Sequence, residues 1–413
     1  MEERQFSPYR WVIEGVLLPL QIGMGLNFMA PAPLFPLIME HYDINRGTVS
    51  LLVAAVTVVV TVFLIPGGIL VARIGPRKAI PLGGLLMAAG LLAPVAHSFW
   101  AVVALRFMFG IGVSIAFPAT SAVTVQWFRS MELPVINGVN LAGQSIGVAV
   151  AMIVAAPIAN AIGWRMAFFL FGAFALIGVT LWLVAGRSAP TPKEPPLPFS
   201  PRDVLPVLFE RNTLLLSIGA AGPFAVFIGF STWLPSYYHD VLGMSISQAS
   251  AMVAILPIMG VVVNPLSGLL QARVGRRKPF LLVPGAVFPL AAIGTFLLFN
   301  HPVAIAISAM VLGICFSMFV PALMTIPMEL PGITVERVAI VTAAALTMGN
   351  LATVISPLFI GALTDALGSY LPSLIVVALL PLTLVITALA IPETGPKASR
   401  VRAATGPVSP TAP

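Results

Sequence analysis

Charged residues are scarce in this sequence, and their scarcity excludes a water-soluble globule. Only 8% of the 413 residues are Asp, Glu, Lys or Arg, whereas soluble domains carry roughly a quarter. The mean hydropathy is +1.03, and 59% of the residues are hydrophobic. So little charge cannot cover a protein of this size in water, and most of its surface has to face lipid. The sequence therefore predicts an integral membrane protein.

Cysteine is almost absent, since Cys315 is the only one in the chain. One thiol can form no intramolecular disulfide and no cysteine-based metal site. The Gly-x-x-x-x-Gly-Lys-Ser/Thr loop that binds ATP phosphates is also missing, which excludes an ATP-driven pump. No stretch is large enough for a soluble catalytic domain. We therefore expect no enzyme activity, no cofactor and no metal site.

The net charge of +7 would suggest a nucleic-acid partner for a soluble chain. In a membrane protein the same excess arises because Lys and Arg are kept in the cytoplasmic loops. We therefore expect the lipid bilayer and a small-molecule substrate as partners, and no nucleic acid. We also expect a monomer.

Apolar runs long enough to cross a bilayer recur along the chain. A bilayer core about 30 Å thick needs roughly 20 apolar helical residues. Twelve such runs are separated by charges or turn residues, and each is predicted to be a transmembrane helix. The first run lacks a small-residue cleavage site and is interpreted as a retained helix, not a signal peptide. The expected spans are 12–39, 48–72, 79–97, 100–125, 135–160, 164–186, 212–238, 247–272, 279–299, 302–327, 337–363 and 370–391.

Basic residues lie mainly on one side of the predicted membrane. If the N-terminus is cytoplasmic, only Arg46 and Arg165 of the 21 Lys and Arg residues fall in outer segments, and only Arg106 lies within a span. By the positive-inside rule, this asymmetry places both termini in the cytoplasm. We expect a multi-pass protein of the cell inner (plasma) membrane.

A proline-rich segment divides the chain in the middle. Residues 188–201 hold six prolines and no apolar run, which is typical of a semi-rigid linker. We expect an N-terminal six-helix bundle over 1–187 and a cytoplasmic linker over 188–211. A C-terminal six-helix bundle over 212–392 and a cytoplasmic tail over 393–413 then complete the chain.

The two halves share a sequence repeat. Residues 68–78 and 268–278 are identical at seven of eleven positions, at an offset of 200. Pro157 and Pro357 keep the same offset. Duplicated halves of six spans are a transporter architecture.

The repeated loop carries the cytoplasmic signature of a known family, which is a glycine, an aspartate four residues on, a basic residue, a glycine and a basic pair. The matching residues are Gly68, Arg73, Gly75, Arg77 and Lys78 in the first half, and Gly268, Arg273, Gly275, Arg277 and Lys278 in the second. Further matches are Leu105-Arg106 with Gly110 and Gly112, Gly163-Trp164-Arg165, and Pro392-Glu393-Thr394. With these motifs the chain resembles a major facilitator superfamily transporter over essentially its whole length.

The resemblance implies an all-α membrane protein with twelve transmembrane helices in two pseudo-symmetric six-helix bundles. It implies transport by alternating access around a site between the halves. The two loops are then expected to act in gating. The signature aspartate is replaced by Ala72 and Ala272, which puts the family's charge relay in doubt here.

Acidic residues near the cytoplasmic helix ends are the expected partners of the gating arginines. We expect Glu329 or Glu336 to pair with Arg273 or Arg277. In the other half, Glu132 is expected to play the same part near Arg73 or Arg77.

Arg106 is the only basic residue well inside a span. A guanidinium at that depth needs a partner or a cavity. Gly110 and Ser114 follow it at spacings of four, so it lies on a helix face of small residues. Two interpretations stay open: an anion-attracting group in the pathway, or a structural arginine bonded to neighbouring helices.

Amide and aromatic side chains on other spans are the remaining candidates for substrate binding. They are Asn27 in the first span, Gln144 in the fifth, Trp233 in the seventh and Asn350 in the eleventh. Amides in hydrocarbon need polar partners, so they point to a wet site or to another helix. The Thr-Trp-Leu-Pro stretch around Trp233 resembles cyanate-permease-like members of the superfamily. Tyr237 and Tyr238 are expected to be anchors at the membrane interface.

Proton coupling would need a titratable group in the pathway. Glu14 and Glu329 lie near the cytoplasmic ends of their spans, and the histidines lie in or near outer loops. The sequence thus leaves symport and antiport open.

The sequence predicts a secondary active transporter that moves a small organic or inorganic anion. One alternative is an exporter of drugs or hydrophobic compounds that works by proton antiport, with Arg106 structural. A more remote alternative is a non-transporting membrane receptor on the same fold.

Overall fold

The computed structural model describes residues 8–128, 132–187, 206–298, 301–330, 335–395 and 397. This part of the chain is helical and contains no strand. Twelve of its helices are long and apolar enough to cross a membrane, which confirms the predicted number of spans. Residues 188–205 of the expected linker and almost all of the expected tail lie outside the described residues, so those domain boundaries stay predictions.

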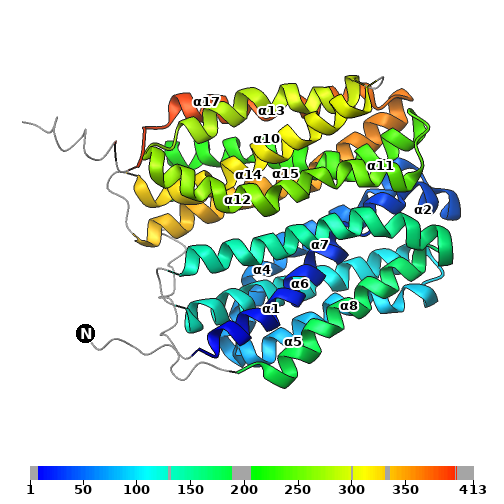
Figure 1. Cartoon of the computed structure of the whole chain (residues 1–413), viewed down its shortest axis with the longest axis horizontal. Helices are drawn as coiled ribbons and strands as arrows, with labels where there is room; N and C mark the ends of the chain where they lie inside the picture. The colour runs from blue at the N-terminus through cyan, green and yellow to red at the C-terminus, as the bar shows by residue number, and fades with distance from the viewer. Residues whose placement is uncertain are drawn as a thin grey trace, which may run out of the picture.

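Each half of the chain forms one bundle, and Figure 1 shows the two bundles side by side. The first half consists of α1 (Arg10–Met29), η1 (Ala32–Leu34), α2 (Phe35–Tyr42), α3 (Arg46–Val49), α4 (Leu51–Ile74), α5 (Pro76–Met87), η2 (Ala88–Val95), α6 (Phe99–Trp127), α7 (Leu133–Ile162) and α8 (Trp164–Ala185). The second half consists of α10 (Arg211–Asp240), α11 (Ile246–Val253), α12 (Ile255–Val274), α13 (Pro279–Leu297), α14 (Pro302–Glu329), α15 (Val335–Leu367), α16 (Leu371–Leu379) and α17 (Leu382–Ala390).

The ends of the helices define two faces of the molecule. Helices α1 and α10 begin, and α8 and α17 end, at the face that we call terminal; it lies to the left in Figure 1. We call the opposite face distal; it carries Arg46 at the start of α3 and Asp240 at the end of α10.

The first span is broken near its middle. Helix α1 ends at Met29, and a 3₁₀ turn over Ala32–Leu34 joins it to α2. Pro31 and Pro33 cause the break, because proline has no N–H to donate to the carbonyl four residues earlier. The Asn27 carbonyl, four residues before Pro31, therefore needs another donor.

In both repeated loops a glycine with a positive φ follows the end of a helix at the terminal face. Gly75 (φ +79°) follows the last residue of α4, and Gly275 (φ +68°) follows the last residue of α12. The two glycines differ in ψ, which is 151° at Gly75 and 17° at Gly275. These backbone angles favour glycine, which explains why the repeat keeps a glycine there. Gly68 and Gly268 differ from these two glycines because they lie inside helices. A Cβ atom added at either position would have no atom within 4 Å.

Among the residues that the structure describes, the apolar core joins the two halves only toward the distal face. One cluster of buried side chains there combines residues of both bundles, such as Phe35 and Val53 with Phe230 and Trp233. Toward the terminal face the described core residues form two separate clusters, one in each bundle. The halves thus share apolar packing distally, and their helices meet where α3 and α4 contact α15 and where α11 and α12 contact α7.

Candidate transport site and distal closure

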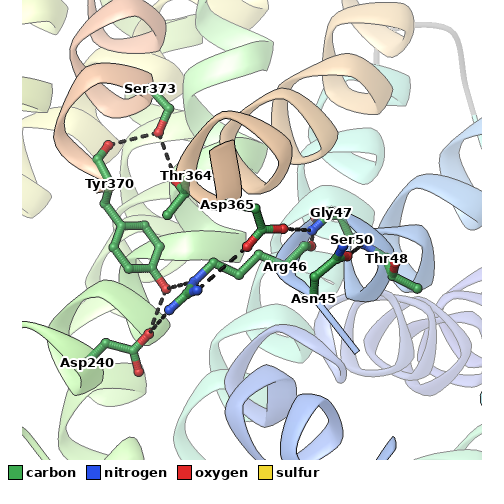
Figure 2. Close-up of polar contacts among 10 residues, drawn as sticks. All are labelled: Asn45, Arg46, Gly47, Thr48, Ser50, Asp240, Thr364, Asp365, Tyr370 and Ser373. Carbon is green, nitrogen blue, oxygen red and sulfur yellow. Dashed lines mark hydrogen bonds and ion pairs between the residues drawn. The ribbon is translucent and has the colours of Figure 1, made fainter. Parts of the chain in front are cut away.

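Arg46 of the first bundle is held by three side chains of the second bundle (Figure 2). Its Nη2 lies 3.1 Å from Asp240 Oδ2, and its Nη1 lies 3.6 Å from Asp365 Oδ1. Its Nε donates to the hydroxyl of Tyr370 at 2.9 Å. The backbone N–H of Gly47 adds a bond to Asp365 Oδ2 at 2.9 Å. We call Arg46, Asp240, Asp365 and Tyr370 the distal closure.

Tyr370 serves both charges of this network. Its hydroxyl donates to Asp240 Oδ2 at 2.7 Å while accepting from Arg46. Burial raises the pKa of Tyr370 above its ordinary value, because a buried phenolate loses its hydration. The hydroxyl therefore keeps its proton and stays a donor to Asp240 at neutral pH. A pocket of about 340 Å³ adjoins the network.

A layer of buried groups lies beneath the distal closure. The Pro357 carbonyl accepts from Ser50 Oγ of the first bundle at 3.0 Å and from Trp233 Nε1 of the second at 2.8 Å. The Trp233 ring also packs edge-on against Phe35, with centroids 5.3 Å apart. At Gly361 a side chain would meet the Arg46 carbonyl at 2.8 Å, so the bundles approach too closely there for any residue but glycine.

Sequence reasoning placed Trp233 in the binding site and did not identify the distal closure. Trp233 is 0% exposed in this conformation and belongs to the layer that joins the bundles. The available signal was one of charge: Arg46 is one of two basic residues expected on the outer side, where Asp240 and Asp365 are also expected. Pairing them required knowledge of which helices adjoin.

Arg106 donates to three backbone carbonyls inside the first bundle. Its Nη1 bonds Asn27 at 2.5 Å, its Nη2 bonds Phe28 at 2.8 Å, and its Nε bonds Leu52 at 2.8 Å. Two of these carbonyls lie at the break of the first span, where prolines leave acceptors free. The side chain is 3% exposed and has no acidic partner among the described residues. These contacts are those of the structural interpretation, and a contact with substrate stays a prediction.

Asn27 lies beside Arg106 and is also bonded within the first bundle. Its Nδ2 donates to the Gly23 carbonyl at 2.9 Å and to the Phe171 carbonyl at 2.8 Å. Asn27 and Arg106 both line a cavity of about 10 Å³, which is the size of one water molecule. In this conformation the cavity is too small for an organic solute.

Gln144 belongs to a chain of polar side chains across α7, α1 and α6. Its Nε2 donates to Gln21 Oε1 at 2.9 Å, and Gln21 Nε2 donates to Thr120 Oγ1 at 3.3 Å. Gln144 is half-buried, whereas Gln21 and Thr120 are buried. The Gln144 amide thus bonds a neighbouring helix and is also partly exposed.

A polar cluster lies where α7 of the first bundle meets α12 of the second. Three polar atoms surround Gly260: a Cβ atom added there would lie 3.2 Å from Ser145 Oγ, 3.4 Å from Asn264 Nδ2 and 3.5 Å from Ser317 Oγ. We call these four residues the mid-depth cluster. It brings amide and hydroxyl groups of both halves together near the middle of the spans.

Asn350 and a group of phenylalanines supply further side chains from the second bundle. Asn350 is half-buried, and its side chain forms no hydrogen bond within the described part of the chain. Phe227 stacks on Phe316 with centroids 4.0 Å apart, and Phe224 packs edge-on against Phe316 at 5.4 Å. All three rings are half-buried. A contact of Gln144 or Asn350 with substrate stays a prediction.

The expected pairing in the second repeated loop is confirmed. Arg277 forms a two-pronged ion pair with Glu329, with N···O distances of 3.0 and 2.7 Å. Glu393 supports the same turn, because its Oε1 accepts from the backbone N–H groups of Arg277 and Lys278. All these residues lie in the second half, so the pair does not join the bundles. Arg273 is exposed, and Glu336 lies among residues whose side chains are not described.

The expected pairing in the first repeated loop is wrong. Glu132 pairs with Arg10 at the start of α1, at 3.0 Å, and not with Arg73 or Arg77. Arg73 and Arg77 are exposed and form no ion pair within the described residues. The arginines of the two repeats thus differ in environment although their sequences match.

The expectation for Tyr237 and Tyr238 is also wrong. Both rings are buried in the second bundle, at 3% and 0% exposure. Their hydroxyls donate to the carbonyls of Phe296 at 2.9 Å and Thr295 at 2.7 Å. They join α10 to the end of α13 instead of lying at the lipid interface.

Known proteins resemble this chain in sequence and in structure. The protein named "Probable sulfoacetate transporter" in Cupriavidus necator is 27% identical over 370 residues, covering 84% of this chain and 85% of that protein. The hexuronate transporter of Bacillus subtilis is 25% identical over 259 residues, covering 59% and 61%. A solved bacterial homologue of the human lysosomal transporter Spinster, inward-facing and unoccupied, superimposes with a TM-score of 0.71 at 16% identity, over 93% and 95% of the chains.

The sequence model of the Major Facilitator Superfamily matches residues 17–335. That match covers most of the chain, and the fold of two six-helix bundles agrees with it. The protein is therefore a transporter and not an enzyme, and it belongs to the Major Facilitator Superfamily.

Proposed function

We propose that this protein moves a small organic anion across the membrane by alternating access. The observation that carries the mechanism is the one-sided packing of the halves. In the part of the chain that the structure describes, the distal closure and the shared core join them only toward the distal face. Alternating access requires such an arrangement, because a solute has to reach a central site from one side at a time.

The terminal face is proposed to be cytoplasmic, as the distribution of Lys and Arg favours. The conformation described here is then inward-facing. The loops with Arg77 and Arg277 lie at the cytoplasmic side, and the distal closure seals the outer side.

The proposal of an anionic substrate has two supports. Arg106 is a buried cation without an acidic partner in the described chain, so its charge makes the potential in the first bundle more positive. The relatives named above are called transporters of sulfoacetate and hexuronate, which are anions. Because Arg106 is occupied by carbonyls, it would act on the solute by its field and not by direct contact.

The direct contacts are proposed to come from neutral polar groups. The mid-depth cluster, Gln144 and Asn350 offer amide and hydroxyl donors near the middle of the spans. The half-buried rings of Phe227 and Phe316 can pack against the apolar part of an organic solute.

Export of a hydrophobic compound is the second candidate. It is favoured by the phenylalanine group and by the three carbonyl bonds of Arg106, which occupy most of its donors. Such a solute would need apolar surface and no anion-binding group.

Uptake into proteoliposomes tests the proposal. Labelled sulfoacetate, a hexuronate and phosphate are offered to the purified protein, with and without a pH gradient, beside a labelled lipophilic cation. Accumulation of an organic anion supports the proposal, and a pH dependence of that uptake supports proton coupling. Transport of the cation with no anion uptake would contradict the proposal and favour the exporter.

A matched pair of variants tests the site itself. Gly260→Leu fills the mid-depth cluster and should abolish uptake. Gly138→Leu is the control, because a side chain there meets no atom within 4 Å. Equal uptake by both variants would remove the mid-depth cluster from the proposed pathway.

A further inference from the structure

Glu14 is a carboxylic acid buried inside the first bundle. It lies on the second turn of α1 and is 6% exposed. Neither of its carboxyl oxygens has a hydrogen-bond partner among the described residues. Burying an ionised carboxylate without a partner costs far more than burying a neutral acid, so this environment favours the protonated form.

Arg10 lies one turn before Glu14, on the same face of α1. Its Nη2 is engaged by Glu132 at the start of α7, at 3.0 Å. Its Nε and Nη1 are buried and have no hydrogen-bond partner among the described residues. Unused donors of Arg10 and unused acceptors of Glu14 thus lie four residues apart on one helix.

Other charged groups do not take the place of Arg10. The helices packed against α1 are α4, α5, α6, α7 and α8. None of their charged groups forms an ion pair with Glu14 in the described part of the chain. The charged residues on these helices or next to their ends are Arg73, Arg77, Lys78, Arg106, Glu132, Arg165 and Arg187.

We propose that Glu14 is a proton-binding site and that, when it loses its proton, it takes Arg10 from Glu132. In the conformation described here Glu14 holds a proton, and Arg10 is paired with Glu132. When the proton leaves to water at the terminal face, Glu14 becomes an anion and Arg10 turns to it. The ion pair between Arg10 and Glu132, which ties the start of α1 to the start of α7, is then lost.

This inference deepens the proposed function. Only the step in which proton binding drives solute movement rests on that function. The occupancy of Glu14 by a proton can be measured without any solute. Its failure is therefore distinguishable from a failure of anion uptake in proteoliposomes.

Infrared difference spectroscopy of the full chain in lipid nanodiscs tests the site. The wild-type protein should show the C=O stretching band of a protonated carboxylic acid at neutral pH, and this band should vanish at alkaline pH. Glu14→Gln should remove the band, whereas Glu210→Gln should keep it, because Glu210 is paired with Arg337 at the same face of the other bundle. Glu14→Asp should shift the band, which covers the case that Glu14→Gln fails to fold. A band that is absent in the wild type, or that persists in Glu14→Gln, would overturn the proposal.

Hydrogen–deuterium exchange tests the transfer of Arg10. Raising the pH of the wild type until the band vanishes should lower the protection of the first turns of α7 several-fold, after correction for the base-catalysed rise of the intrinsic exchange rate. In Glu14→Gln the corrected protection should stay unchanged over the same range. Equal pH dependence in both proteins would show that Arg10 does not respond to Glu14.

Discussion

Arg46 of the first bundle and Asp240 of the second form an ion pair, with 3.1 Å between Nη2 and Oδ2. The same guanidinium also faces Asp365 and donates a hydrogen bond to the Tyr370 hydroxyl. One residue of the first half therefore meets an acidic and aromatic set of the second half. No comparable ion pair joins the halves at the terminal face within the described residues.

We expect Arg46→Ala to weaken the distal closure. Partly exposed ion pairs contribute roughly 0–1 kcal/mol each, so the loss should raise the population with an open distal face by up to several-fold. Pulsed electron paramagnetic resonance between spin labels at Glu40 and Ala366, in a Cys315→Ser background, would show it as a longer distance.

Arg165→Ala is the control for that experiment. Arg165 also lies at the distal face, but within the described residues it bonds only to the first half, for example to Tyr42 and Ala96. Its removal should leave the label distances unchanged. Equal distance changes in both variants would mean that Arg46 acts through its own bundle.

We expect Tyr370 to make the distal closure sensitive to alkaline pH. Burial raises the pKa of Tyr370 in the folded protein. Its contribution to the stability of the fold is therefore complete below the pKa of an unfolded tyrosine, about 10. The contribution is lost as pH rises above that value, because the unfolded chain then releases the proton more easily. Thermal unfolding from pH 8 to 11 should show a smaller loss for Tyr370→Phe than for the wild type. An identical pH dependence would contradict this role.

We expect Arg106→Met to lower stability, because it leaves carbonyls of Asn27, Phe28 and Leu52 without their donor. An unsatisfied buried polar group costs about 1–3 kcal/mol. Arg106→Lys keeps the charge but loses the planar fork, so it should be destabilised as well. If the field of Arg106 attracts an anion, the lysine variant should keep part of the uptake that the methionine variant loses. Thermal unfolding and anion uptake, measured on both variants, separate structure from substrate attraction.

We expect the two repeated loops to respond differently to the same substitution. Arg277→Gln breaks a largely buried two-pronged pair and should cost about 3–5 kcal/mol of stability. Arg77→Gln, the repeat equivalent, removes an exposed side chain and should change stability by less than about 0.5 kcal/mol. Chemical unfolding in detergent compares them. Equal effects would mean that the exposed arginine has a partner in another conformation that dominates stability.

We expect Gln144→Leu and Asn350→Leu to act differently. Gln144→Leu leaves Gln21 Oε1 without a donor, so it should lower stability by about 1–3 kcal/mol. Asn350 has no side-chain hydrogen bond in the described chain, so Asn350→Leu should spare stability and weaken anion affinity. Unchanged affinity in both variants would exclude them as direct contacts.

The sequence by itself determined the class of protein, the number of spans and the family. Scarcity of charge, apolar runs of membrane length and the repeat around Gly75 and Gly275 all depend on local pattern. A membrane imposes the first two of these patterns segment by segment, because each span has to be apolar and has to satisfy its own backbone.

Only the tertiary structure decided which polar groups meet. Arg106 looked the same in sequence whether it faced a solute or the carbonyls freed by Pro31, because that choice depends on how α1 and α4 lie against α6. Arg77 and Arg277 match in sequence, yet in the described part of the chain only Arg277 pairs with a carboxylate, since Glu329 ends a helix beside its loop. The pairing of Arg46 with Asp240 joins residues 194 positions apart. Such long-range partners are set by the packing of the two bundles, which no local pattern encodes.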